Sequence, residues 1–169
     1  MSILNPEHLL AQATRLIEPR PAGPPLQVDV RRAISAAYYA VFHAVLTAAA
    51  DEMVGRVHRG TPGYTLVYRS VDHKALRTVC EMAQARTPPP RYRPFLPDNG
   101  FAEDIRTFVR DVLSLQERRH AADYDPTDQF RTAHARQTIE LARRALHHWD
   151  NAPRSERKTL LTVLLFPPR

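Results

Sequence analysis

Apolar residues recur three and four positions apart in several separate stretches of the chain, a spacing typical of amphipathic helices. The predicted helices cover residues 5–17, 29–53, 72–85, 101–123 and 127–150. No extended run alternates apolar and polar residues between turn signals, so no strand is predicted within these stretches. The pattern therefore predicts an all-α fold, an antiparallel helical bundle of four main helices plus short terminal helices.

Prolines and capping residues set the expected boundaries of these helices. None of the 15 prolines interrupts a periodic stretch, as expected because proline breaks a helix interior. Asn5 with Pro6, then Asp29, Asp72 and either Thr127 or Asp128 are suited to the helix starts. We expect residues 54–71 to form a glycine-containing loop and residues 86–99 a proline-rich connector. Residues 155–166 favour a short helix, with an added strand over 159–166 as the alternative.

The length of 169 residues predicts a single domain with a sizeable core. We divide it into an N-terminal helix and proline-rich linker (1–27), a bundle core (28–150) and a basic and apolar tail (151–169). No apolar run approaches the length of a membrane span, so no membrane partner is expected. The N-terminus lacks a secretory signal and Cys80 is the only cysteine, which together favour a cytoplasmic protein.

The net charge of +6 lies mainly near the C-terminus. Residues 131–169 hold eight of the 24 Lys and Arg residues but three of the 18 Asp and Glu residues. Such a surplus can attract phosphates or an acidic partner protein. It has a second explanation, because 22 of the 24 cations are arginine and a GC-rich genome favours arginine codons.

Polar side chains lie next to the predicted buried faces of two helices, residues 101–123 and residues 29–53. The apolar stripe of residues 101–123 continues by four positions to Arg119. Arg119 either neutralises the end of its own helix and pairs with Asp123, or it points into a cleft or dimer seam and binds a phosphate. On residues 29–53, Ser35, Tyr39 and His43 share one helix face. Tyr39 and His43 are either hydrogen-bonded core residues, or His43 is a second-site acid or base.

The segments Ser35-Ala36-Ala37-Tyr38-Tyr39-Ala40-Val41-Phe42-His43 and Arg118-Arg119-His120-Ala121-Ala122-Asp123-Tyr124-Asp125-Pro126 resemble the two signature regions of HEPN domains. The resemblance covers roughly residues 28–149. HEPN domains are small helical bundles that are often encoded beside nucleotidyltransferases or within bacterial defence and toxin–antitoxin systems. The resemblance implies a homodimer that acts on or binds RNA, with a nucleotidyltransferase as a further expected partner.

The same resemblance implies a site at the second segment. Active HEPN ribonucleases use an Arg, four to six intervening residues and a His, without metal, at a dimer interface. After Arg119 and four intervening residues (120–123) the chain has Tyr124 instead of His, in an Arg-x-x-Ala-Asp-Tyr form that is similar to another HEPN branch. The implied catalytic residues are Arg119, Asp123 and Tyr124, with His120 and His43 as neighbours. His120 should point about 100° away from Arg119 around a helix.

Three functional hypotheses follow from these observations. The first is an RNA-binding or RNA-cleaving protein, for which we expect nucleic-acid contacts at Arg118, Arg119, Arg136, Arg143 and Arg144. The second is a non-catalytic nucleotide-, RNA- or partner-binding module in which a nucleotidyltransferase modifies Tyr124. The third is a scaffold whose residues 131–169 bind an acidic protein. No metal or cofactor is expected, because neither zinc-ligand spacing nor a glycine-rich phosphate loop is present.

Overall fold

The computed structural model describes residues 4–21 and 23–169 as one helical bundle without strands in these ranges. Its helices are α1 (Pro6–Leu16), α2 (Gln27–Met53), α3 (Pro62–Tyr68), α4 (His73–Gln84), α5 (Glu103–Tyr124), α6 (Thr132–Asn151) and α7 (Arg154–Leu165). Two short 3₁₀ turns, η1 (Arg56–His58) and η2 (Arg93–Phe95), lie in the connections. The all-α prediction is confirmed.

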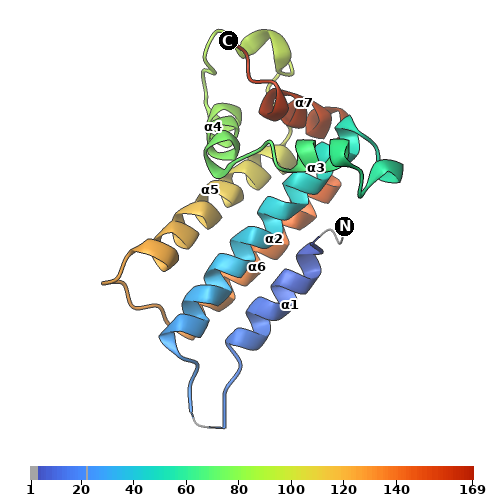
Figure 1. Cartoon of the computed structure of the whole chain (residues 1–169). Helices are drawn as coiled ribbons and strands as arrows, with labels where there is room; N and C mark the ends of the chain where they lie inside the picture. The colour runs from blue at the N-terminus through green and yellow to red at the C-terminus, as the bar shows by residue number, and fades with distance from the viewer. Residues whose placement is uncertain (1–3, 22) are drawn as a thin grey trace.

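Helix α2 forms the centre of the bundle and packs against α1, α5 and α6 (Figure 1). Helices α1, α2, α5 and α6 run along a common direction, and successive members of this set alternate in orientation. Helices α3, α4 and α7 gather at one end of the long helices. The bundle is therefore built by α1 together with α2, α5 and α6, whereas α4 contacts mainly α5 and α7.

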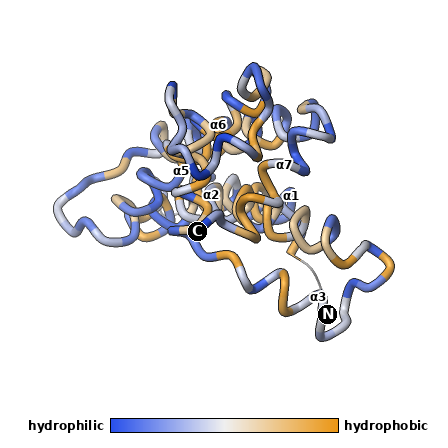
Figure 2. Tube along the Cα trace, turned by 90° about the horizontal axis from the view of Figure 1, so that it is seen from above, coloured by the Kyte–Doolittle hydropathy of each residue, from blue (hydrophilic) through white to orange (hydrophobic). Residues whose placement is uncertain are grey.

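One continuous cluster of apolar side chains holds the described helices together. Viewed from above, hydrophobic residues recur along α1, α2 and α7 toward the middle of the molecule (Figure 2). Leu10 and Ala13 of α1 are completely buried, so this helix belongs to the core. Trp149 of α6 is 6% exposed, lies 4.8 Å from the ring of Phe108 and has the guanidinium of Arg157 on α7 at 5.9 Å. This contact joins α5, α6 and α7.

Side-chain hydrogen bonds to the backbone explain two helix starts that were predicted correctly and one that was not. Asn5 accepts a hydrogen bond from the backbone N–H of Glu7, and Asp72 accepts one from Ala75 at 2.7 Å, as predicted for α1 and α4. Helix α6 begins at Thr132 and not at residue 127 or 128, so that prediction was wrong. The reason is that the Asp125 carboxylate accepts the backbone N–H groups of Thr127 and Asp128 and closes a turn there.

The loop predicted over residues 54–71 was also wrong in part, because η1 and α3 lie within it. Pro62 occupies the first turn of α3, where a missing N–H costs nothing, and Thr61 accepts a hydrogen bond from the backbone N–H of Tyr64. The completely buried Tyr64 then anchors α3, since its hydroxyl donates to Asp51 of α2 at 2.9 Å. A seven-residue helix is too short to show a periodic pattern in sequence.

The C-terminal segment is helical as predicted, and the strand alternative does not occur. Leu160, Leu161, Val163 and Leu164 of α7 are each no more than 5% exposed. The carboxylate of Glu156 on α7 accepts the backbone N–H of Ala102 just before α5, at 2.8 Å. Helix α7 therefore belongs to the core and also caps the helix that carries Arg119.

Helix α2 is the one described helix that is long and apolar enough, by length and composition, to cross a membrane. Small and polar residues interrupt this stretch, so no continuous apolar run marks it in the sequence. Two-thirds of the relevant window (67%) is buried inside the bundle. The same composition is typical of the central helix of a globular protein.

Candidate functional site

Arg119 extends the buried face of α5, as the apolar stripe predicts, and reaches α2. Its side chain is 13% exposed, and its Nη2 donates to the hydroxyl of Tyr39 at 3.2 Å. The guanidinium carbon also lies 5.6 Å from the centre of the Tyr39 ring, a distance suited to a cation–π contact. Arg119 therefore connects the two sequence segments that carry the HEPN resemblance.

Asp123 holds Arg119 in place. Its Oδ2 lies 2.7 Å from Nε of Arg119, an ion pair without an aligned hydrogen bond, while its Oδ1 accepts the hydroxyl of Ser35 on α2. Burial favours a lower pKa for the guanidinium, but the hydrogen bond to Tyr39 and the charge of Asp123 outweigh it and raise that pKa. Arg119 is consequently a fixed cation.

Tyr124 lies on the solvent side of the same guanidinium. Its hydroxyl accepts from Nη2 of Arg119 at 3.4 Å, and its ring centre lies 5.2 Å from the guanidinium carbon. The Tyr124 side chain is 62% exposed, and the ring of His120 packs 5.0 Å from it. The structure thus brings Arg119, Asp123 and Tyr124 together, with His120 in contact with Tyr124.

An open groove of about 1050 Å³ runs past Arg119 between the start of α4 and the end of α5. Arg119, His120 and Tyr124 form the α5 side, while His73 and Lys74 lie on the α4 side. The groove wall also includes Arg77, Gln116, Glu117, Ala121, Asp125 and Pro126. Part of its positive charge is neutralised, because Arg77 pairs with Glu81 at 2.7 Å and with Glu117 at 3.6 Å.

A cluster of rings on α2 and α4 lies behind the groove. The ring of His73 packs 4.2 Å from Phe42, 5.4 Å from Tyr38 and 5.7 Å from Tyr39. Burial, followed by the charge of Arg119, lowers the pKa of His73. Sequence reasoning missed His73, because the proximity of α4 to the tyrosines depends on packing between helices that are distant in sequence.

His43 lies one helical turn beyond Tyr39, outside the groove. Its Nδ1 is 2.7 Å from the hydroxyl of Tyr68, and its ring packs 6.1 Å from that of Tyr39. Burial, and then the neighbouring His73, lower the pKa of His43. His43 is therefore a neutral, hydrogen-bonded side chain near neutral pH, and its contacts are with Tyr39 and Tyr68 and not with the groove.

Of the five arginines predicted to contact nucleic acid, Arg119 alone lines this groove. Arg118 donates to the hydroxyl of Thr138 at 3.1 Å, and Arg136 is exposed on α6. Arg143 pairs with Glu140, and Arg144 makes two hydrogen bonds to the carboxylate of Asp111. Asp111 is 2% exposed, so the charge of Arg144 is needed to compensate a buried anion.

Replacing Arg144 with Ala is expected to lower the free energy of unfolding by about 2 kcal/mol, because it leaves the Asp111 carboxylate buried without its partner. This loss is smaller than that expected on breaking a fully buried ion pair, because the Arg144 side chain is 55% exposed. Arg143→Ala is the matched control, because it breaks an exposed pair worth less than about 1 kcal/mol. Urea denaturation of both variants measures the difference, and equal midpoints would contradict this role of Arg144.

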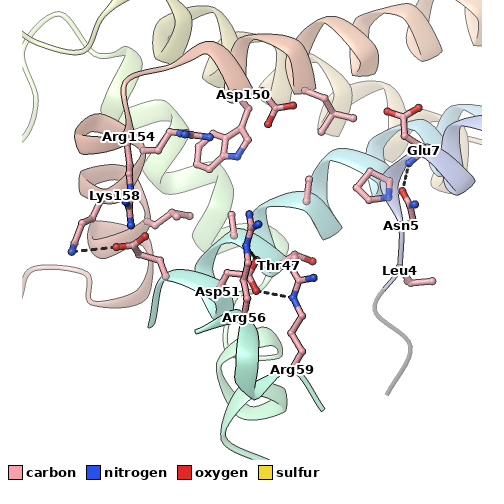
Figure 3. Close-up of a pocket in the computed structure, with 18 residues that line it drawn as sticks. Leu4, Asn5, Glu7, Thr47, Asp51, Arg56, Arg59, Asp150, Arg154 and Lys158 are labelled. Atoms are coloured by element: carbon pink, nitrogen blue, oxygen red, sulfur yellow. Dashed lines mark hydrogen bonds and ion pairs between the residues drawn. The ribbon is translucent and has the colours of Figure 1, made fainter. Parts of the chain in front are cut away.

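A second groove, of about 840 Å³, lies between the start of α1, the end of α2, η1 and the junction of α6 with α7 (Figure 3). Its charges largely compensate one another. Arg59 donates two hydrogen bonds to Asp51, and Lys158 lies 3.2 Å from Glu52. The Arg119 groove differs from it in lying beside the segment of α5 that carries the HEPN resemblance.

Among residues 4–21 and 23–169, no group of three or more His, Cys, Asp and Glu side chains is arranged to hold a metal ion. Cys80 is completely buried in α4, and burial raises the pKa of its thiol. No known family model, curated protein or solved structure matches the chain. The functional assignment therefore depends on the geometry of the Arg119 groove and on the sequence resemblance.

Proposed function

We propose that this chain is a HEPN-type, cytoplasmic protein of a bacterial toxin–antitoxin or defence module, and that it binds RNA through the Arg119 groove. The observation that carries the proposal is the position of the Arg119 guanidinium, fixed between two tyrosine hydroxyls and Asp123 at the wall of an open groove. No described residue accepts a hydrogen bond from its Nη1. That nitrogen is therefore free to donate to a phosphate oxygen.

RNA is a suitable ligand because the groove combines cations with an exposed aromatic ring. Lys74 adds positive charge across from Arg119. Tyr124 exposes 62% of its side chain, and single-stranded bases stack on such rings. A homodimer follows from the family resemblance, with the groove of one copy facing that of the other.

The geometry favours binding over cleavage. Tyr124 stands at the position where active HEPN ribonucleases have His, and a phenol is a poor general base near neutral pH. We therefore assign Arg119, Asp123 and Tyr124 to phosphate recognition.

Fluorescence anisotropy with a labelled single-stranded RNA tests the proposal, and total RNA incubated in EDTA tests for cleavage. We expect saturable binding that Arg119→Ala weakens, and no products specific to the wild-type chain. Products with 2′,3′-cyclic phosphates that disappear in Arg119→Ala would show that the site also cleaves. Absence of both binding and cleavage, or equal behaviour of the two proteins, would overturn the assignment.

A second candidate function rests on the exposure of Tyr124. A nucleotidyltransferase partner needs an accessible hydroxyl, and Tyr124 is 62% exposed, with a hydrogen bond of 3.4 Å from Arg119 to its hydroxyl. We expect mass spectrometry of the chain, co-expressed with such an enzyme, to find nucleotidyl mass on the Tyr124 peptide and none in Tyr124→Phe. An unmodified Tyr124 peptide throughout would exclude this role.

A further inference from the structure

His73 is the first residue of α4 and lines the same groove as Arg119. Its backbone is fixed on both sides. The preceding residue, Asp72, caps α4 by accepting the backbone N–H of Ala75. The backbone carbonyl of His73 accepts a hydrogen bond from Nε2 of Gln116 on α5 at 2.9 Å. The start of α4 is thus tied directly to the helix that carries Arg119.

The imidazole ring of His73 is held as firmly as its backbone. Phe42, Tyr38 and Tyr39 pack around it with ring centres between 4.2 and 5.7 Å away. Tyr39 also accepts the hydrogen bond from Arg119, so Arg119 and His73 contact the same tyrosine. Both residues also line the groove.

The hydrogen-bond network determines which nitrogen of His73 carries the proton. Nδ1 lies 2.8 Å from the hydroxyl of Tyr38, a side chain that is 1% exposed. Nδ1 is the only acceptor that this hydroxyl has among the described residues, and burial raises the pKa of Tyr38, so the phenol keeps its proton. Tyr38 consequently donates to Nδ1, and the proton of the neutral ring resides on Nε2.

We infer that His73 is a second phosphate ligand, whose Nε2–H donates to a non-bridging oxygen of the RNA phosphate bound by Arg119. This inference rests on the proposed function and adds a residue from α4 that the signature segments do not contain. A neutral N–H donor gives directional recognition of the phosphate without a further charge. Because Nε2 already holds its proton, His73 cannot take one from a ribose 2′-hydroxyl, which agrees with binding without cleavage.

Two substitutions separate the donor role of His73 from its packing role. The amide nitrogen of Gln reaches the position of Nε2, so His73→Gln keeps a donor to the phosphate and loses the Tyr38 contact. The shorter amide of Asn reaches only the position of Nδ1, so His73→Asn keeps a partner for Tyr38 and loses the donor. A purely structural His73 would show the opposite order of effects.

The measurements are the Kd for a labelled single-stranded RNA, its dependence on salt, and the Tm of each variant. We expect His73→Asn to weaken binding about tenfold, as for one lost hydrogen bond to a charged group, while His73→Gln stays within about twofold of wild type. The slope of log Kd against log salt should be unchanged in both variants, because no cation is removed. Tm should fall more in His73→Gln than in His73→Asn.

The binding results distinguish failure of the His73 inference from failure of the proposed function. If Arg119→Ala weakens binding but both His73 variants bind like wild type, the inference fails and the proposed function stands. Weaker binding by Gln than by Asn also overturns the inference, because the Tyr38 contact would then be what matters. If wild type does not bind RNA, or Arg119→Ala binds equally well, the proposed function fails and the His73 role fails with it.

Discussion

Arg119→Ala is expected to weaken RNA binding by about 10- to 150-fold, the range for losing charge-assisted hydrogen bonds of about 1.5–3 kcal/mol. The loss has two sources. The guanidinium no longer meets the phosphate, and Asp123 becomes an uncompensated carboxylate beside it. The slope of log Kd against log salt should also decrease by about one, because one phosphate contact is lost. Fluorescence anisotropy across a salt series measures both quantities.

Two matched variants make this result specific. Arg119→Lys keeps the charge but cannot reproduce the planar fork that meets Asp123 and both tyrosines, so we expect intermediate affinity. Arg106→Ala removes an exposed arginine from the same helix, about 20 Å away along its axis. Arg106→Ala should bind RNA as wild type does. An equal loss in Arg106→Ala and Arg119→Ala would indicate diffuse electrostatic attraction and no defined site.

Removing residues 154–169 is expected to abolish cooperative unfolding. Helix α7 buries Leu160, Leu161, Val163 and Leu164, and burial of such a side chain contributes about 1.5–3 kcal/mol. Four of them amount to roughly 6–12 kcal/mol, which is comparable to the entire stability of a typical domain, about 5–15 kcal/mol. Circular dichroism during urea denaturation should show a broad transition or none for the truncated chain.

The control for this truncation is Lys158→Ala, which removes a tail cation and its pair with Glu52 but no buried apolar surface. We expect it to unfold cooperatively near the wild-type midpoint. A truncated chain that stays cooperatively folded would contradict the core role of α7. It would also support the hypothesis that residues 131–169 serve as a docking segment for an acidic partner.

The long helices could be predicted from sequence because their signals are local. Asn5 and Asp72 cap the helices that they were expected to open, and the buried face of α5 follows the periodic apolar stripe. The start of α6 could not be placed correctly, because Thr127 and Asp128 are both good capping residues but instead bond to Asp125. Short α3 depends on the contact of Tyr64 with Asp51, which local periodicity does not contain.

The candidate site could be predicted only where one helix contains it. Arg119 and Asp123 are four residues apart on α5, so their ion pair was among the expected alternatives. The contact of His73 with Tyr38 joins residues 35 positions apart, and the contact of Arg144 with Asp111 joins residues 33 positions apart. Both depend on how helices pack against each other. Residue spacing along the chain therefore identifies neither His73 as a residue of the site nor Arg144 as the partner of a buried carboxylate.

Trp149 can serve as an intrinsic fluorescence probe of the folded state. It is the only tryptophan of the chain, and its indole lies shielded where α5, α6 and α7 meet. Its fluorescence emission should therefore shift to longer wavelength when water enters this junction. Because Trp149 does not line the Arg119 groove, the emission follows the integrity of the fold independently of whether the groove is filled.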